Sequence, residues 1–321
     1  TGRDLEARAL AGAGFDLRRV RSAGLRGKSV GALIRGMVVL PFSAWDAWRL
    51  IDQVAPHVVI GLGGYSSGAV VLVAAIRRIP TLVLEQNAVP GVTNRILAPF
   101  VTAAAVSFEQ VLPYFRGRGF VSGNPVRAEF FESTLPTTTP RGDVHLLVLG
   151  GSQGAHAINV AMMAAAPVLA EAAVPFVVTH QTGERDCGAV KRVYSEVGLT
   201  AKVEPFLDQM ATAMRDADVV VCRAGATTLA EVSAVGRAAL LIPLPGATDR
   251  HQQRNADALL RVGAADVLSQ LEMTGTLLAE RLLRLGGDGV RQRRMAAAAR
   301  ALARPDAARI VVDRTEQLMQ W

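Results

Sequence analysis

Cysteine is nearly absent from this sequence, which contains only Cys187 and Cys222 among its 321 residues. Two cysteines form no disulfide framework, and such low usage is typical of a protein from a reducing compartment. The five histidines are scattered along the chain, and neither they nor the cysteines have the close spacing of a metal site. The sequence therefore predicts neither a bound metal nor a cofactor.

Long apolar runs are missing as well. Although 50% of the residues are hydrophobic, no run approaches the ~18 consecutive apolar residues that a membrane-spanning helix needs. Aromatic residues make up only 5% of the chain, whereas alanine and glycine are abundant. Small side chains suit helices that pack tightly on sheets, and a chain of this length can form two domains with large cores.

Acidic residues are outnumbered by basic ones, 28 to 35, which gives a formal net charge of +7. A basic protein favours anionic partners such as nucleic acids, phospholipid head groups or phosphorylated substrates. The basic residues are spread along the chain and form no blocks, so we do not expect nucleic acid to be the partner.

Strand-like apolar runs alternate with helix-like stretches along almost the whole chain, a pattern typical of parallel α/β layers. The alternation is interrupted at 124–143, where Pro, Thr and mixed polar residues occur, and it restarts with the apolar run at 144–150. We therefore place an interdomain linker at 124–143. The sequence predicts two Rossmann-like α/β domains with parallel sheets that face a cleft.

Glycine turns follow buried strand-like runs at 61–68, 150–154 and 222–225. A strand, a glycine turn and a helix N-terminus can bind an anion, because glycine lets backbone N–H groups approach and the helix dipole adds about half a positive charge. The turn at 150–154 is neither a Walker A loop nor a dinucleotide fingerprint, since both sequence patterns are absent. A tight turn whose glycines serve only packing is the alternative.

Polar residues after the third turn point to a sugar nucleotide. Thr227 and Thr228 lie at an expected helix start, and Glu231 follows in what we expect to be its first turn. Such residues often serve only as an N-cap and a complement to the helix dipole, but a carboxylate can also accept hydrogen bonds from both hydroxyls of a ribose. Gln252 and Gln253 can donate and accept at once, as sugar hydroxyls require. Alone they would indicate a solvated helix start.

Seven segments carry a resemblance to a known family: GLRGK (24–28), GLGGYSSG (61–68), LEQNAVPGVTN (84–94), GNPVR (123–127), GGSQGAHAIN (150–159), CRAGATTLAE (222–231) and HQQRNA (251–256). In this order they resemble the MurG family of glycosyltransferases. The resemblance implies a GT-B fold and an inverting enzyme of peptidoglycan synthesis. Such an enzyme moves GlcNAc from UDP-GlcNAc to the 4-hydroxyl of MurNAc in undecaprenyl-diphosphoryl-MurNAc-pentapeptide, which converts lipid I to lipid II.

The resemblance also implies binding residues. The donor diphosphate would lie against Ser152 and Gln153, the ribose against Glu231 and the uracil against Leu207. The implied substrate-binding residues are Asn87, Arg127, Ser152, Gln153, Leu207, Ala226, Thr227, Thr228, Leu229, Ala230, Glu231, Gln252 and Gln253. On the acceptor side they are Tyr65, Ser66 and Glu85.

A domain plan follows from the same resemblance. Residues 1–123 would form an acceptor-binding, membrane-associated domain, 144–304 a UDP-GlcNAc-binding domain, and 305–321 a helix that crosses back to the first. In the family, the first strand is followed by a glycine-rich loop whose histidine is thought to be the general base. We expect that strand and loop to lie upstream of Thr1, so that this truncated chain would contain no catalytic base of its own.

A membrane-facing surface is expected within residues 24–48, where Arg26, Lys28 and Arg35 accompany apolar residues. These apolar residues are Val30, Leu33, Ile34, Met37, Val38, Phe42 and Trp45. The combination suits an anionic membrane interface, and a core helix packed on the sheet is the alternative. Because the implied acceptor is lipid-linked, we expect peripheral attachment to the cytoplasmic face of a bacterial inner membrane. Cell-wall and division proteins are the partners that the resemblance suggests.

Other functions stay open from sequence. The chain could be a non-catalytic remnant that binds a nucleotide sugar, or a different GT-B-like enzyme such as a UDP-GlcNAc 2-epimerase or a diacylglycerol glycosyltransferase. An epimerase needs catalytic carboxylates and a histidine at its pocket, and we can assign no such set. A nicotinamide dehydrogenase is disfavoured because the dinucleotide fingerprint is absent.

Overall fold

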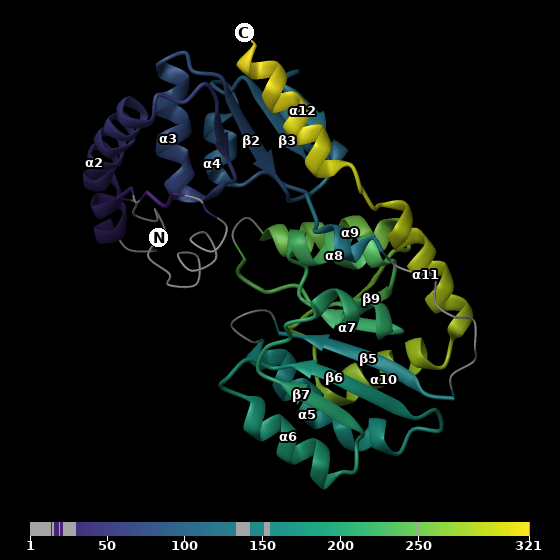
Figure 1. Ribbon diagram of the computed structural model, residues 1–321. Coiled ribbons are helices and arrows are strands. Elements are labelled where there is room, and N and C mark those ends of the chain that lie inside the picture. The colour runs from purple at the N-terminus through teal and green to yellow at the C-terminus, as the bar shows by residue number, and fades with distance from the viewer. Residues whose placement is uncertain are drawn as a thin grey trace. The chain divides into compact units, whose positions relative to one another are not determined.

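The computed structural model describes residues 14, 16–18, 20–21, 30–132, 142–150, 155–247 and 250–320, with only the backbone described for 30–40, 65 and 66. The chain forms two compact units (Figure 1). Of the described residues, the first unit contains those up to Gln86, Pro90–Ser122 and the chain from Arg309 onward. The second unit contains Asn87–Val89 and Gly123–Ala308.

A four-stranded parallel sheet with strand order β1-β2-β3-β4 forms the centre of the first unit. Its strands are β1 (Val59–Gly61), β2 (Thr81–Glu85), β3 (Ala103–Val106) and β4 (Gly119–Val121). Its helices are α2 (Val30–Val54), α3 (Gly64–Ile76), α4 (Val92–Leu97), the 3-10 helix η1 (Glu109–Phe115) and most of α12 (Ala307–Met319).

Helices cover both faces of this sheet, and the sequence of β2 shows why. Every residue of β2 is buried, as expected of an inner parallel strand between two helix layers. Because side chains alternate along a strand, Val83 packs with α3, α4 and η1. Leu82 and Leu84 point the other way and pack against Val311 and Leu318 of α12.

A six-stranded parallel sheet with the order β10-β9-β8-β5-β6-β7 forms the centre of the second unit. Its strands are β5 (Val144–Leu149), β6 (Phe176–Gln181), β7 (Ala201–Glu204), β8 (Val219–Cys222), β9 (Ala238–Leu241) and β10 (Asp266–Val267). Its helices are η2 (Ala128–Phe130), α5 (His156–Ala170), α6 (Cys187–Glu196), α7 (Met210–Asp216), α8 (Ala226–Val235), α9 (His251–Arg261), α10 (Gly275–Gly286) and α11 (Gly289–Ala301).

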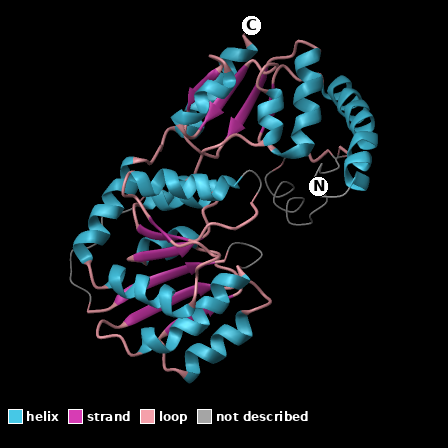
Figure 2. Cartoon of the chain, turned by 180° about the vertical axis from the view of Figure 1, so that it is seen from behind, coloured by secondary structure: helices cyan, strands magenta, loops and turns pink. Residues whose placement is uncertain are grey.

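Helices also lie on both faces of this second sheet (Figure 2). Helices α5, α6 and α10 share one apolar core, which contains Ile158, Tyr194 and Leu282 and the inward side chains of β5. Helix α7 lies on the opposite face, where it contacts β5 and α8. The predicted α/β class with two parallel sheets is therefore confirmed.

The strand order of the second unit reverses between β5 and β8. The chain runs outward from β5 to β6 and β7, and then returns to β8 on the other side of β5. These two central strands pair up to Leu149, which lies opposite Cys222. The carboxyl ends of these two strands therefore lie side by side, and ligands of open parallel sheets bind at such a reversal.

The predicted linker at 124–143 is only partly described. Residues 124–132 are counted with the second unit and include η2, whereas 133–141 lie outside the described residues. In the described part of the chain, no helix is both long enough and apolar enough to cross a membrane.

Candidate functional site

Helix α8 begins just after β8, and no side chain caps its N-terminus. Its N-cap residue is Gly225, in an extended conformation. The five residues Ala226–Ala230 form the first turns of the helix, so neither Thr227 nor Thr228 is the N-cap that the sequence suggested. The first amide groups of α8 have no acceptor within the helix and can bind an anion. Leu229 is buried in the core, so only its backbone could reach a ligand.

Glu231 lies in the second turn of α8, one turn later than the sequence suggested. Its carboxyl group is half-buried, and this burial raises its pKa, which Arg127 opposes and Glu129 reinforces. Among the described residues, no hydrogen-bond donor reaches this carboxylate. A partly desolvated carboxylate without donors is unfavourable. The geometry therefore suits a ligand that brings two hydroxyl donors.

Arg127 brings positive charge to the same side of α8. Its guanidinium pairs with Glu129 at 3.0 Å and lies over the ring of Phe130, 5.2 Å from the centroid. It also interacts electrostatically with Glu231. More than half of the Arg127 side chain is exposed. Its charge is thus held near Glu231 while the guanidinium stays accessible to an anionic ligand.

A buried asparagine of α9 fixes the position of Asn87. Asn255 is fully buried, and its Nδ2 donates to Oδ1 of Asn87 at 3.1 Å and to the carbonyl of Ala224 at 3.1 Å. Its Oδ1 accepts from the amide of Ala88 at 2.8 Å. Asn87 is thereby tied beside the loop that leads into α8. Asn255 lies within the HQQRNA segment, but sequence reasoning did not select it.

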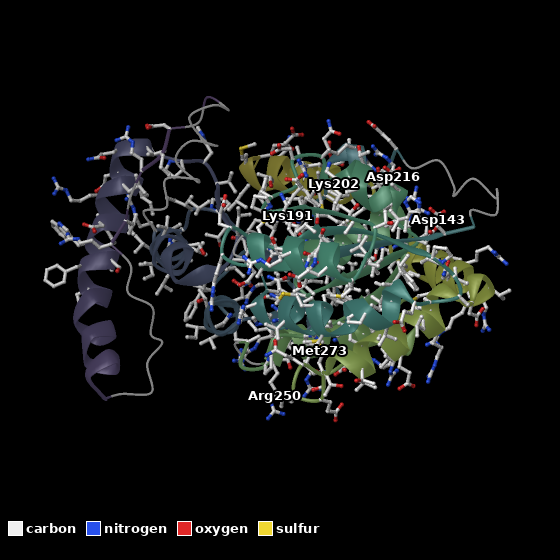
Figure 3. The ribbon with its side chains drawn as sticks, turned by 90° about the horizontal axis from the view of Figure 1, so that it is seen from below. Asp143, Lys191, Lys202, Asp216, Arg250 and Met273 are labelled. Carbon is white, nitrogen blue, oxygen red and sulfur yellow. The ribbon has the colours of Figure 1, made fainter. Side chains whose placement is uncertain are left out.

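The two glutamines near the start of α9 are already engaged. Oε1 of Gln252 accepts from the amide of Leu244 at 2.9 Å, and Nε2 of Gln253 donates to Asp257 at 2.8 Å. Among the described residues, Nε2 of Gln252 and Oε1 of Gln253 have no partner. Each glutamine therefore keeps one polar atom for a ligand. The helix is preceded by the exposed Arg250 (Figure 3).

The glycine turn after β5 is described only at its start. The amide of Gly150 donates to the carbonyl of Gln181 at 3.0 Å, which ties the ends of β5 and β6 together. Ser152 and Gln153 lie outside the described residues. Helix α5 then begins at His156, and its N-cap Ala155 makes no side-chain cap hydrogen bond. A second uncapped helix N-terminus therefore follows the strand next to β8.

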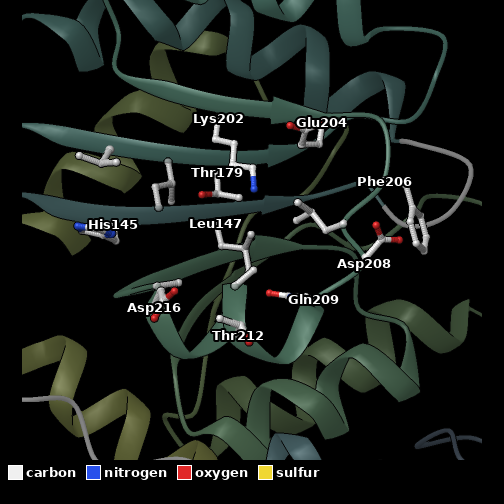
Figure 4. A pocket seen from close by; sticks show the side chains of 15 residues that line it. His145, Leu147, Thr179, Lys202, Glu204, Phe206, Asp208, Gln209, Thr212 and Asp216 are labelled. Carbon is white, nitrogen blue, oxygen red and sulfur yellow. The ribbon is translucent and has the colours of Figure 1, made fainter.

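A groove of about 520 Å³ runs along β5, β6 and β7 on the face of the sheet that carries α7 (Figure 4). His145, Leu147 and Thr179 point into it, because alternate residues of each strand face this side. Lys202 borders it on β7. Of the predicted donor-site residues that are described, only Leu207 lines this groove, and it follows the end of β7 in the chain.

The predicted acceptor-side residues lie in the first unit. Tyr65 and Ser66 occupy the first turn of α3, and their side chains lie outside the description. Glu85, at the end of β2, is only 2% exposed. Its Oε2 accepts from the amide of Gly91 at 2.9 Å and from Nδ2 of Asn94 at 2.8 Å. Glu85 therefore shapes the turn between β2 and α4 from inside the unit.

The glycine turn of the first unit also has structural requirements. Gly63 and Gly64 have φ angles of 90° and 81°, which residues with a side chain rarely adopt. A Cβ atom on Gly68 would lie 2.7 Å from Cγ2 of Thr93, so α3 and α4 pack closely there. Backbone shape and packing therefore account for these glycines.

Helix α2 buries one stripe and exposes aromatic residues on another. Ala47 and Ile51 are buried and pack with α3, whereas Phe42, Trp45 and Trp48 are 51%, 60% and 43% exposed. The core-helix alternative therefore accounts for one stripe only. Arg26 and Lys28 lie outside the described residues, and only the backbone is described for Val30, Leu33, Ile34, Arg35, Met37 and Val38.

Metal ligands do not gather at these elements. Over the described ranges, no group of three or more His, Cys, Asp or Glu residues is placed to hold a metal ion. The described part of the second unit contains the uncapped N-termini of α5 and α8, the half-buried carboxylate of Glu231, which no described donor reaches, and the accessible Arg127.

Comparison with known proteins finds close relatives. Residues 145–311 match the glycosyltransferase family 28 C-terminal domain, and residues 1–106 match the family 28 N-terminal domain. The UDP-N-acetylglucosamine–N-acetylmuramyl-(pentapeptide) pyrophosphoryl-undecaprenol N-acetylglucosamine transferase of Pelobacter propionicus is 43% identical over 335 residues, which cover 98% of this chain and 88% of that protein.

Two solved structures also match the fold of this chain. The crystal structure of Acinetobacter baumannii MurG matches with a TM-score of 0.80 and 31% identity, over 98% of this chain and 88% of that one. A UDP-GlcNAc 2-epimerase from Neisseria meningitidis matches with a TM-score of 0.62 over 97% of this chain and 88% of that one. At 11% identity the epimerase shares the fold alone.

Proposed function

The chain belongs to the family 28 glycosyltransferases that are named UDP-N-acetylglucosamine–N-acetylmuramyl-(pentapeptide) pyrophosphoryl-undecaprenol N-acetylglucosamine transferases, and we propose that it converts lipid I to lipid II. It is a hexosyltransferase with the GT-B fold. In the proposed reaction the 4-hydroxyl of MurNAc attacks the anomeric carbon of GlcNAc from the face opposite UDP. The new C–O bond forms as the bond to the diphosphate breaks, the hydroxyl proton is released, and the product is β1→4 linked.

The departing diphosphate would lie where the loops after β5 and β8 leave the sheet. Negative charge builds up on it as its bond to GlcNAc breaks, and preorganised donors stabilise such charge well. The uncapped N-termini of α5 and α8 would provide these donors. Ser152 and Gln153, which precede α5 in the sequence, and the accessible guanidinium of Arg127 would add side-chain contacts.

The nucleoside would be recognised by a carboxylate and an apolar contact. Glu231 would accept hydrogen bonds from both ribose hydroxyls, which supplies the donors that its carboxylate lacks in the described residues. The uracil would lie against Leu207, at the end of the groove beside α7. Thr227 and Thr228 would line the nucleotide from the first turn of α8.

The GlcNAc hydroxyls would meet amides from two segments. Gln252 would use Nε2, since its Oε1 accepts from Leu244. Gln253 would use Oε1, since its Nε2 donates to Asp257. Asn87, held by Asn255, would provide a further amide beside the loop before α8.

The acceptor would be handled by the first unit. Its exposed aromatic residues on α2 suit a membrane interface, where Trp side chains prefer to lie. Arginines accompany them, because Arg21 lies over Phe42 at 5.3 Å and Arg77 over Trp48 at 5.0 Å. We propose peripheral attachment to an anionic inner-membrane surface, with Tyr65 and Ser66 on the acceptor side.

The observation that carries this proposal is the pairing of Leu149 with Cys222, because the two strands that precede α5 and α8 end side by side on the unit that contains Glu231. The test combines two measurements on the chain: UDP binding by calorimetry, and transfer of radiolabelled GlcNAc to a lipid I analogue. We expect the chain to bind UDP, and the transfer assay to distinguish an active enzyme from a binding remnant. Absence of UDP binding would overturn the donor site, and UDP binding without transfer would favour a binding remnant.

A further inference from the structure

A chain of buried polar side chains lies behind the first turn of α5. Asn159 of α5 is fully buried, and its Nδ2 donates to the carbonyl of Thr182 at 2.9 Å and to Oδ2 of Asp186 at 2.8 Å. Its Oδ1 lies 3.0 Å from Nε2 of His180. Nδ1 of the same imidazole lies 2.9 Å from the hydroxyl of Tyr194. One hydrogen-bonded chain thus joins α5, the end of β6 and α6.

The chemistry of the partners fixes the direction of every hydrogen bond in this chain. The carbonyl of Thr182 can only accept, which sets the orientation of the Asn159 amide. Nε2 of His180 must therefore carry a proton and donate, so its Nδ1 accepts from Tyr194. Burial lowers the pKa of His180 to about 3 and keeps the ring neutral. All of these donors point, one after another, toward the carboxylate of Asp186.

Asp186 accepts the last hydrogen bond of this series of side chains and remains ionised. Burial acts to raise its pKa, but hydrogen bonds from Asn159 and from His156 outweigh that effect and hold the pKa below its ordinary value. The contact with His156 joins Nδ1 to the carboxylate at 2.9 Å. Asp186 occupies the N-cap position of α6, yet its side chain makes no cap hydrogen bond there.

The carboxylate of Asp186 therefore serves α5 instead of its own helix. His156 and Asn159 are three residues apart, so they lie on one face of the first turn of α5. One ionised group holds both of them. A side-chain cap on α5 would use up the first amide groups of the helix. The arrangement through Asp186 orients this turn and leaves those amides available.

We propose that Asp186 is a positioning residue for the diphosphate of the nucleotide-sugar donor, acting through His156 and Asn159 on the first turn of α5. This inference rests on the proposed function, because the amides of α5 are assigned there to the diphosphate. Asp186 itself touches no substrate. Its loss lets the first turn of α5 shift, and a small misplacement of binding groups is costly when geometry is preorganised.

The test measures the affinity of the full chain for UDP by calorimetry and for uridine by ligand-observed NMR. For Asp186→Ala we expect UDP binding to weaken roughly tenfold while uridine, which lacks phosphates, binds as before. A general loss of structure would weaken both ligands alike. Asp186→Asn, which keeps the side-chain volume and one acceptor oxygen, should show a smaller loss and serves if the alanine variant does not fold.

Two further variants sharpen the test. Asp266→Ala is the matched control, since Asp266 is a buried carboxylate of the same unit that pairs with Arg281 and Arg291. It should reduce stability and leave the ratio of UDP to uridine affinity unchanged. Asn159→Asp should weaken UDP binding by opposing two carboxylates, and adding Asp186→Asn should restore part of the affinity.

The outcomes separate the two proposals. If the unchanged chain does not bind UDP, the proposed donor site is wrong and the positioning role falls with it. If the unchanged chain binds UDP and folded Asp186→Ala binds it equally well, the positioning role alone is overturned. Equal weakening for Asp186→Ala and Asp266→Ala would also overturn it, because the effect would then be general destabilisation.

Discussion

The backbone amide of Ala88 donates to Oδ1 of Asn255, 167 residues further along the chain, at a distance of 2.8 Å. Nδ2 of the same asparagine reaches Asn87 and the carbonyl of Ala224. Three hydrogen bonds of this buried side chain thus hold the Asn87–Val89 segment beside the loop before α8. The segment contains Asn87, and the loop leads into α8, whose first two turns contain residues that we assign to the donor.

Replacing Asn255 by alanine should therefore affect both stability and donor binding. Removal of these buried hydrogen bonds should cost about 1–3 kcal/mol in the free energy of unfolding, measured with urea. KM for UDP-GlcNAc should rise because Asn87 loses its support. Leu260→Gln is the control, since Leu260 is exposed on the same helix and has no role in the proposed site; its unfolding free energy should change by less than about 0.5 kcal/mol. An Asn255→Ala variant with unchanged stability would contradict this reading.

Glu231 should lower the stability of the folded chain at neutral pH and strengthen the binding of UDP. Because its pKa is raised in the folded chain, the ionised form costs stability at neutral pH, and this cost disappears as pH falls through the folded pKa. Glu231→Gln should thus be slightly more stable than the unchanged chain at pH 7 but not at pH 4. Thermal unfolding at the two pH values measures this. A variant that is less stable at pH 7 would contradict the assigned burial effect.

The same variant should bind UDP roughly 10- to 100-fold more weakly, because hydrogen bonds to a charged acceptor contribute about 1.5–3 kcal/mol. Calorimetry with 2′-deoxy-UDP provides the matched control. The deoxy ligand should lose affinity for the unchanged chain, and Glu231→Gln should weaken its binding less than it weakens that of UDP, since one of the two contacts is already missing. Fully additive losses would show that Glu231 does not hold the ribose.

Much of the fold could be predicted from the sequence because apolar runs mark the inner strands. β2, β3, β5, β8 and β9 all follow from such runs. The strands β4, β7 and β10 were not predicted, and β4 has only three residues at the edge of its sheet. β7 is an edge strand that exposes Ala201 and Lys202, and β10 has only two residues, so neither carries a long apolar run.

The site was predictable where a residue follows a glycine turn, and unpredictable where polar groups meet inside the core. Glu231 lies next to such a turn. Asn159, His180 and Asp186 come from α5, β6 and the start of α6, and no local pattern brings them together. The sequence signal for this cluster is His180, at the end of an apolar strand. Its burial decides whether such a histidine belongs to the core or binds a ligand.

Neutral His180 should make stability depend on pH. Its pKa is about 3 in the folded chain and about 6.5 when unfolded. The folded state is favoured above pH 6.5, and this advantage is lost as pH falls, because only the unfolded state takes up the proton. Between pH 7.5 and 5 the unfolding free energy of the unchanged chain should fall by about 2 kcal/mol relative to His180→Gln. A constant difference across this range, measured with urea, would contradict a buried neutral histidine.

The aromatic surface of α2 should bind anionic membranes. Phe42 and Trp45 are more than half exposed, and burying such a side chain in an apolar environment contributes about 1.5–3 kcal/mol. The double variant Phe42→Glu/Trp45→Glu should therefore lower the partition coefficient into phosphatidylglycerol-containing vesicles by at least roughly tenfold, measured by sedimentation. Leu271→Glu is the matched control, because Leu271 is 84% exposed in the second unit and outside this surface. Equal losses for both variants would indicate a simple effect of net charge, whereas a loss confined to the α2 variant would assign the membrane contact to that helix.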